Sequence, residues 1–178
     1  MLNILKDLYS TKEAVSIYTN QNDINKFHFG TVLAVNEREI AIHMISPDGE
    51  DDGIIAMDVN NIFRVEQKGQ YKDKMEKLCS SNVFPAYDLE VTDGRIIEAV
   101  ILLAFKEKAV LSIELLNSGF NDIVGFVEAI DSTECKILQV DEYGRADGVS
   151  HVFTDDITNV TVLSEDEKRI QRLWELNQ

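Results

Sequence analysis

The carboxylates of this chain that could bind a metal ion stand in one polar segment. Asp48, Glu50 and Asp52 occupy alternate positions, and Gly53 follows them. Carboxylates at this spacing before a glycine are typical of the opening of a calcium-binding loop. Such a loop needs a bidentate glutamate at its twelfth position, and that position is Val59 here. We therefore expect a solvated turn in this segment and predict no metal site.

A second group of residues has the types that a nucleophilic enzyme uses. His151 precedes two aspartates, and pairing between strands could bring Cys135 beside it. A histidine next to a cysteine can activate the thiol for attack on a substrate. An internal repeat, described below, has Ala56 and Ile40 at the positions of His151 and Cys135. Because both counterparts are apolar, we expect packing positions, and we predict no catalytic residue and no cofactor.

Basic side chains gather on two short segments. They are Lys68, Lys72, Lys74, Lys77, Lys168, Arg169 and Arg172. They could contact RNA phosphates, or they could solvate the outer faces of two helices and pair with neighbouring acids. The chain has 32 acidic and 17 basic residues, which give a formal net charge of −15. That field repels a phosphate backbone, so the composition argues against nucleic acid, although a local basic patch could still bind it.

Apolar residues at helical spacing form a stripe close to the C-terminus. Ile170, Leu173 and Trp174 follow one face of a predicted helix, which Ser164 and Glu167 begin as a capping box. This stripe could dock on a partner protein, or it could pack against its own domain. We predict it as the candidate partner surface.

All of these residues belong to a chain that contains one segment twice. Residues 26–65 are repeated as residues 121–160, and adding 95 to a position in the first copy gives its counterpart in the second. The glycines that obey this offset are Gly30, Gly49, Gly53, Gly125, Gly144 and Gly148. A shared glycine spacing indicates a shared backbone path, because glycine is kept where φ is positive or another chain segment approaches closely. We predict two domains, 1–80 and 94–178, joined by a linker at 81–93.

Length and composition agree with two small domains. Of the 178 residues 44% are hydrophobic, as is usual for a folded protein. A domain of this size buries only about 60% of its unfolded surface, so each should lean on the other or on another chain. The longest apolar run, Ala99–Phe105, is too short for a membrane span, and the N-terminus lacks a secretory pattern. We expect a cytoplasmic protein without a membrane partner, in which Cys79 and Cys135 are thiols.

Hydrophobic periodicity predicts a similar series of elements in each half. In the first half it predicts helices at 1–9 and 70–79, and strands at 13–19, 26–36, 38–46, 53–59 and 62–66. In the second half it predicts strands at 110–116, 123–130, 135–140, 148–153 and 157–162. The segment 96–107 aligns with the first helix and is predicted to be helical. A strand after the Asp93–Gly94 turn is the alternative, because this segment is apolar on nearly all sides.

Both halves also share a motif in which a glycine precedes an apolar residue and then an Asp or Asn. The residues that form it are Gly30, Val32 and Asn36 in the first copy, and Gly125, Val127 and Asp131 in the second. A polar turn with Gly49 or Gly144 follows, and then the apolar pair Ile62 and Val65 or Ile157 and Val160. This pattern resembles the Sm and Sm-like family. The resemblance implies a mainly β fold of two tandem Sm-like five-stranded, bent-sheet barrels, each with a leading and a closing helix.

The chain departs from that family where its RNA-binding members hold a base. Such members carry an Asn shortly after the acidic turn position and an Arg-Gly pair before the last strand. By register, Ile40 and Cys135 stand at the Asn position, while Asp58-Val59 and Phe153-Thr154 stand at the Arg-Gly position. The usual uridine pocket is therefore not expected here.

Two functions follow as expectations from this reading. The first is a non-enzymatic, duplicated Sm-like module that acts through protein association, with itself as a homo-oligomer or with another protein. The alternative is a riboregulatory, RNA-binding Sm-like protein that uses a non-standard surface. The candidate RNA-facing turns for that alternative contain Asn36, Arg38, Asn60, Asn61, Asp131 and Ser132.

Overall fold

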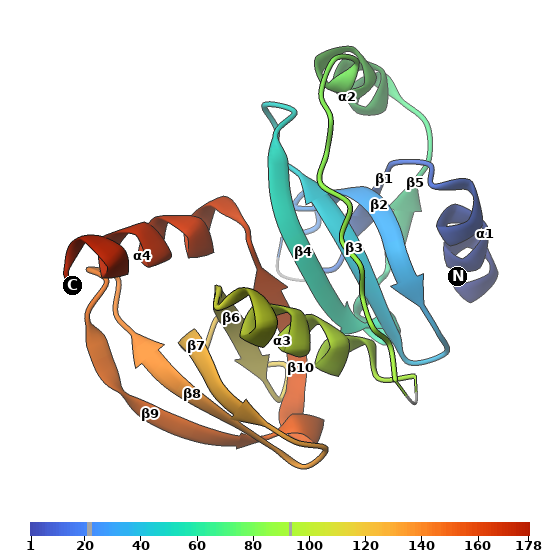
Figure 1. Ribbon diagram of the computed structural model, residues 1–178. Helices are drawn as coiled ribbons and strands as arrows, with labels where there is room; N and C mark the ends of the chain where they lie inside the picture. The colour runs from blue at the N-terminus through green and yellow to red at the C-terminus, as the bar shows by residue number, and fades with distance from the viewer. Residues whose placement is uncertain (21–22, 93) are drawn as a thin grey trace.

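The first half of the chain forms two helices around five strands in the computed structural model of this protein (Figure 1). The structure describes residues 1–20, 23–92 and 94–178. The elements are α1 (Leu2–Thr11), β1 (Val15–Tyr18), β2 (His28–Val35), β3 (Glu39–Ile45), β4 (Asp51–Asp58), the short 3-10 helix η1 (Val59–Asn61), β5 (Arg64–Glu66) and α2 (Gln70–Cys79). The predicted helices and strands are confirmed, and only their ends differ. Asp93, at the end of the predicted linker, lies outside the described residues.

The second half repeats this series. Its elements are α3 (Ile96–Glu107), β6 (Val110–Leu115), β7 (Ile123–Ile130), β8 (Glu134–Val140), β9 (Ala146–Phe153), the 3-10 helix η2 (Thr154–Asp156), β10 (Ile157–Val162) and α4 (Glu165–Leu176). The alternative of a strand at 96–107 is wrong. That segment is apolar on most sides because α3 lies between strands of both halves and buries six of its residues: Ile96, Ile97, Ala99, Val100, Ile101 and Ala104.

The start of α4 confirms the predicted capping box. The Ser164 hydroxyl accepts a hydrogen bond from the Asp166 N–H at 3.2 Å, and the Glu167 carboxylate accepts one from the Ser164 N–H at 3.2 Å. Glu167 is 2% exposed and also accepts a hydrogen bond from the buried Ser112 hydroxyl at 2.5 Å. The carboxylate thus satisfies both a helix N-terminus and a strand hydroxyl, as a buried polar group requires.

All ten strands belong to one antiparallel sheet. Their order is β5-β1-β2-β3-β4-β10-β6-β7-β8-β9. The expectation of a mainly β fold with flanking helices is confirmed, and the finer expectation of two Sm-like barrels stays a prediction. The two halves are continuous because β10 of the second half lies between β4 and β6 (Figure 1).

The internal repeat extends to the irregularities of the sheet. A register shift lies between Val32 and Ala34, and an equivalent shift lies between Val127 and Ala129. The β3–β4 and β8–β9 ladders share a second shift at equivalent positions. A bulge bends its strand, so equal bulges at equal positions produce the same curvature twice.

Gly30 and Gly125 are glycines for the same reason. A Cβ on Gly30 would lie 1.9 Å from the His43 carbonyl oxygen, and a Cβ on Gly125 would lie 2.0 Å from the Leu138 carbonyl oxygen. The neighbouring strand therefore crosses each glycine too closely for any side chain. The shared glycine spacing in the sequence thus indicated two equivalent close approaches of the backbone.

Apolar residues of the two halves share one core. The cluster around α3 contains Ala41, Ile54 and Ala56 of the first half together with Val100 and Val160 of the second. A separate cluster, which includes Leu5 and Leu8 of α1, fills the first half alone. The second half therefore cannot keep its core intact without the first half beside it. Among the described residues, no helix has both the length and the apolarity to cross a membrane.

Candidate functional site

The central feature of the molecule is the joint between its halves, where β4 pairs with β10. Ala56 lies opposite Val160, and Ile54 lies opposite Val162. Gly53, with φ of 69°, enters this joint so closely that a Cβ would lie 2.2 Å from the Val162 carbonyl oxygen. The joint is thus a continuous strand ladder at which the backbones meet without room for another side chain. We call it the inner joint.

Two carboxylates of the first half cap helices of the second half across the inner joint. Asp52 accepts a hydrogen bond at 2.9 Å from the N–H of Glu165, the first residue of α4. Glu39 accepts hydrogen bonds from the N–H groups of Ile96 and Ile97, at 2.5 and 3.1 Å, at the start of α3. Both contacts satisfy N–H groups that lack a partner within the helix and place negative charge at its positive end.

Asp51 ties three parts of the chain together at the same place. Its carboxylate lies 2.9 Å from His43 Nε2, accepts hydrogen bonds from the Tyr87 hydroxyl at 2.8 and 3.0 Å, and accepts one from Lys168 Nζ at 2.9 Å. Burial alone would raise the pKa of Asp51, but the hydrogen bonds from Lys168, Tyr87 and His43 outweigh burial and lower that pKa. Burial, followed by the contact with Asp51, raises the pKa of Tyr87.

Helix α3 covers one face of the inner joint. Ile97 is 7% exposed and Val100 is fully buried, in the same apolar cluster as the alanines of β3 and β4. Ala41 and Ala56 are small, so a helix can approach the sheet closely at this point. The inner joint therefore combines a strand ladder, two helix caps and an apolar helix face.

The counterparts of the α3 face and of strand β4 are exposed to solvent at the outer ends of the sheet. At the start of α1, the counterparts of Ile97 and Val100 are Met1, which precedes the helix, and Ile4, and they are 49% and 41% exposed. We align the two helices by their ends, because Lys12 and Lys108 both adopt the left-handed conformation and end α1 and α3. This alignment gives an offset of 96 for the helices. Strand β9, the counterpart of the buried β4, is exposed over most of its length. Val149 is 49% exposed, whereas its counterpart in β4 is fully buried.

Larger polar side chains replace small ones on the outer face of β8 and β9. Lys136 and His151 stand where the inner joint has Ala41 and Ala56. Lys136 pairs with Glu128 at 2.8 Å, and His151 pairs with Glu134. The outer face of the second half is therefore more polar than the equivalent face inside the inner joint.

The predicted partner surface lies mainly against its own half. Ile170, Leu173 and Trp174 are all partly buried, and the Trp174 ring packs on the Phe126 ring with 5.4 Å between centroids. Leu173 lies against Gly144, where an added Cβ would meet the Leu173 backbone at 2.4 Å. The stripe joins α4 to the sheet and to the β8–β9 turn.

The six candidate RNA-facing residues lie in three places: the β2–β3 turn, the 3-10 helix η1 and the β7–β8 turn, which is the counterpart of the β2–β3 turn. The Asn36 side chain accepts hydrogen bonds from the N–H groups of Arg38 and Glu39, both at 2.8 Å, and Asp131 accepts equivalent bonds from Thr133 and Glu134. Arg38 and Ser132 lie in these two turns, where the Arg38 carbonyl accepts from the Val59 N–H and the Ser132 carbonyl accepts from the Thr154 hydroxyl. Asn60 and Asn61 lie in η1, where the Asn60 N–H donates to Asp58 and the Asn61 amide donates to Asn117. Asn36 and Asp131 therefore use their side-chain oxygens to shape these two turns.

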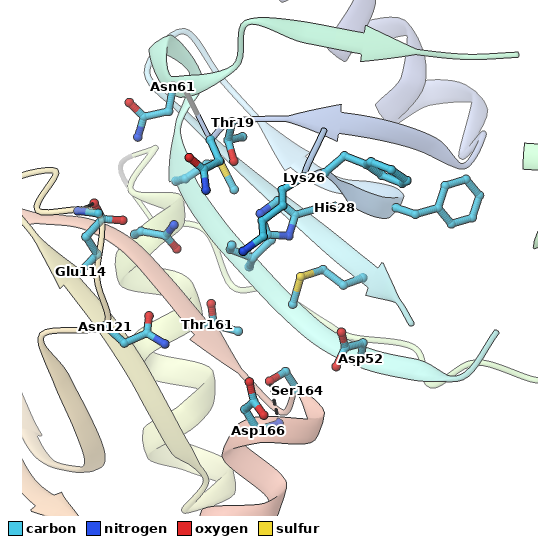
Figure 2. Close-up of a pocket in the computed structure, with 18 of the residues that line it drawn as sticks. Thr19, Lys26, His28, Asp52, Asn61, Glu114, Asn121, Thr161, Ser164 and Asp166 are labelled. Carbon is cyan, nitrogen blue, oxygen red and sulfur yellow. Dashed lines mark hydrogen bonds between the residues drawn. The ribbon is translucent and has the colours of Figure 1, made fainter. Parts of the chain in front are cut away.

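A groove of about 1100 Å³ lies between the halves (Figure 2). Strands β4 and β10, the loops before β2 and β7, and the start of α4 line it. Its acidic members are Asp52, Glu114, Asp166 and Glu167, against the single lysine Lys26. Burial lowers the pKa of His28, which also faces the groove, although Asp52 opposes that shift. Such a lining attracts cations and repels phosphates.

Cys135 and His151, the residues considered for nucleophilic catalysis, lie on opposite faces of the sheet. Cys135 lies opposite Val152, and the next pair along the ladder is Lys136 with His151, so Cys135 and His151 point to opposite faces. Burial raises the pKa of the Cys135 thiol to about 11. Within the described ranges, no three His, Cys, Asp or Glu side chains lie close enough together to hold a metal ion.

Sequence reasoning missed the inner joint, although one signal of it was present. Asp52 and Gly53 are repeated without change as Asp147 and Gly148. The structure shows that Asp52 caps α4 and that Gly53 contacts the Val162 backbone at the inner joint. Tyr87 gave no signal, because the segment 81–93 has no counterpart in the repeat. Comparisons with protein-family models, with curated proteins and with solved structures found no match to this chain.

Proposed function

We propose that this chain is a non-enzymatic, duplicated Sm-like module that self-assembles head to tail. In this assembly the β9 edge of one copy pairs with the β5 edge of the next. The observation that carries the proposal is the inner joint, in which a fourth strand (β4) pairs with a fifth strand (β10) of the other half. Strand β9 is the counterpart of β4, and β5 is the counterpart of β10, so the sheet ends in two complementary edges.

The Sm-like part of the proposal is supported by the strand order. Each half contains a leading helix, five antiparallel strands and a closing helix, and β5-β1-β2-β3-β4 and β10-β6-β7-β8-β9 have the same order. Gly30 and Gly125 occupy equal crossings in the two halves. The free thiols of Cys79 and Cys135 fit a reducing compartment such as the cytoplasm.

The offset of 95 gives the register of the outer joint. Val65 would lie opposite His151 as Val160 lies opposite Ala56, and Glu66 would lie opposite Ser150. The exposed Met1 and Ile4 of one copy would then face β8 and β9 of the copy whose β9 edge pairs with its β5. An interface between two different surfaces is heterologous, so the assembly closes into a ring or extends as a filament.

The outer joint should be weaker than the inner joint. Lys136 and His151 would lie under the apolar side chains of α1, and Ala146 stands at the position of Asp51, so the ion pair with Lys168 has no counterpart. Loss of an apolar contact and of a charge pair lowers affinity without removing the ladder. We expect an assembly that dissociates on dilution.

Light scattering coupled to size exclusion tests this proposal. The wild-type mass should rise with concentration through multiples of the 20.2 kDa chain. The Thr154 N–H donates to the Thr133 carbonyl just beyond the end of the β8–β9 ladder. Alternate residues of a strand donate to the same side, so the His151 N–H points outward. His151→Pro removes that outward donor and should give a monomer, whereas the control His151→Thr keeps the donor and should still assemble.

Two results would overturn the proposal. One is a wild-type protein that stays at the mass of a single chain up to near-millimolar concentration. The other is a His151→Pro variant that folds normally, by circular dichroism, and assembles as well as the wild type. A titration with short RNAs at low and moderate salt tests the alternative function, since salt-sensitive micromolar binding by the monomeric variant would favour RNA as the partner.

A further inference from the structure

The inner joint contains two helix caps whose acidic residues are repeated at the outer edge. Asp52 caps α4 at the N–H of Glu165, and its counterpart by the offset of 95 is Asp147. The counterpart of Glu165 is Gln70, the first residue of α2. Asp147 and Gln70 are both exposed. The donor and the acceptor of a cap are therefore both present, at opposite ends of one chain.

The receiving helix lacks the cap that its counterpart has. Helix α2 begins after Gly69, which has no side chain to cap it, and no described side chain is seen to accept from its first N–H groups, whereas α4 has both Ser164 and Asp52 at its first turn. A helix N-terminus without a side-chain cap leaves N–H groups for water or for a partner. The other cap is repeated only in part, because Glu39 repeats as Glu134, which pairs with His151 of its own half.

We propose that Asp147 caps helix α2 of a second copy of this chain, at the N–H of Gln70. The proposal rests on the proposed head-to-tail assembly and adds the residue that orients it. Strand pairing through β9 and β5 specifies neither register nor partner strongly, because every strand edge offers the same N–H and C=O groups. A charged hydrogen bond at one helix end selects a single register, since a slip of one residue moves Asp147 away from it.

The close approach of backbones fits the same arrangement. Gly53 is pressed against Val162 in the inner joint, while Gly148, its counterpart with φ of 105°, has no atom within 4 Å of an added Cβ. The outer edge therefore has open space at the position where, in the inner joint, the backbone of the other half lies. The β9 edge, the space at Gly148 and the exposed Asp147 lie next to one another along eight residues of one strand.

The test measures the dissociation constant of self-association by analytical ultracentrifugation. Asp147→Ala removes the acceptor, and Gln70→Pro removes the donating N–H at a helix position where proline is well tolerated. Each should weaken association by about five- to tenfold. The double variant should be no weaker than either single variant, because both remove one and the same hydrogen bond. Gln70→Ala keeps the N–H, and Glu142→Ala removes an exposed acid of the β8–β9 turn, so neither should change the constant.

A mixing experiment separates this cap from a general loss of stability. A Gln70→Pro chain keeps an intact Asp147, and an Asp147→Ala chain keeps an intact α2, so the mixture can form one complete joint per pair. The mixture should associate with wild-type affinity and stop at a heterodimer in the concentration range where neither variant assembles alone. Failure of the mixture to associate, or additive losses in the double variant, would overturn the cap.

The outcomes also distinguish the cap from the assembly itself. If His151→Pro abolishes association but Asp147→Ala leaves it unchanged, the edge pairing stands and the cap is wrong. If the wild type never associates, the assembly is wrong, and the cap is wrong with it.

Discussion

At the residue scale, Asp51 is the side chain that connects the most distant parts of the chain. It contacts His43 in β3, Tyr87 in the segment before α3, and Lys168 in α4. Hydrogen bonds to a charged group contribute about 1.5–3 kcal/mol each when their partners are partly buried. The charge of this carboxylate therefore helps to attach the first half to α4.

We predict that Asp51→Asn destabilises the protein by about 1–3 kcal/mol near neutral pH. The three hydrogen bonds outweigh burial and lower the folded pKa of Asp51 below its ordinary value of 3.8, so the charge stabilises the fold above pH 3.8. This stabilisation is lost as the pH falls from 3.8 through the folded pKa. The difference in unfolding free energy between wild type and variant, measured by urea denaturation, should therefore shrink in acid.

Asp48→Asn serves as the control, because Asp48 lies exposed in the turn before β4. It should change the unfolding free energy little at any pH. A stability gap for Asp51→Asn that stays constant from neutral to acidic pH would contradict the assigned role of the charge.

At the element scale, α4 is held at both ends. Its first turn is capped by Ser164 and by Asp52 of the other half. Its C-terminal end lies on the β8–β9 turn, where the Asn177 side-chain amide donates to the carbonyls of Tyr143 and Gly144, both at 2.9 Å. Its apolar stripe fills the space between these ends. The helix thus acts as a brace across one face of the second half.

We predict that Trp174→Ala lowers the unfolding free energy by about 1–3 kcal/mol, less than for a fully buried aromatic residue. The tryptophan is only partly buried, and its ring packs on Phe126 of its own half. The mass measured by light scattering should not change. Leu176→Ala, at a position 74% exposed in the same helix, is the control and should affect neither quantity. A loss of assembly in Trp174→Ala would instead place the partner contact on this helix.

At the scale of the whole molecule, the two halves are one structural unit. The β4–β10 ladder joins their sheets, and the cluster around α3 contains residues of both. Neither half can unfold while leaving the other's buried surface intact. The duplication visible in the sequence therefore does not correspond to two separately packed cores.

We predict a single cooperative thermal transition for the full chain. Calorimetry of the monomeric His151→Pro variant should give a ratio of calorimetric to van't Hoff enthalpy of about one, because the shared core couples the halves. Two resolved transitions would show instead that each half is stable alone.

Much of the fold could be predicted because local signals agree with it. The bounds of α2 follow from spacing, the start of α4 follows from Ser164 and Glu167, and the bent strands follow from Gly30 and Gly125. The segment of α3 was the exception that left an alternative, because a helix buried on most sides loses the one-sided pattern by which helices are recognised.

The sequence by itself determined the order of the elements and their duplication, because capping, glycine spacing and periodicity act over a few residues. Only the tertiary structure decided which edges pair, that Met1 and Ile4 are exposed while Ile97 and Val100 are buried, and that Asp51 meets Lys168. The physical reason is that every strand edge presents the same backbone groups, so the choice of neighbour depends on the small side chains at Ala41 and Ala56 and on charges that meet only after the chain has folded.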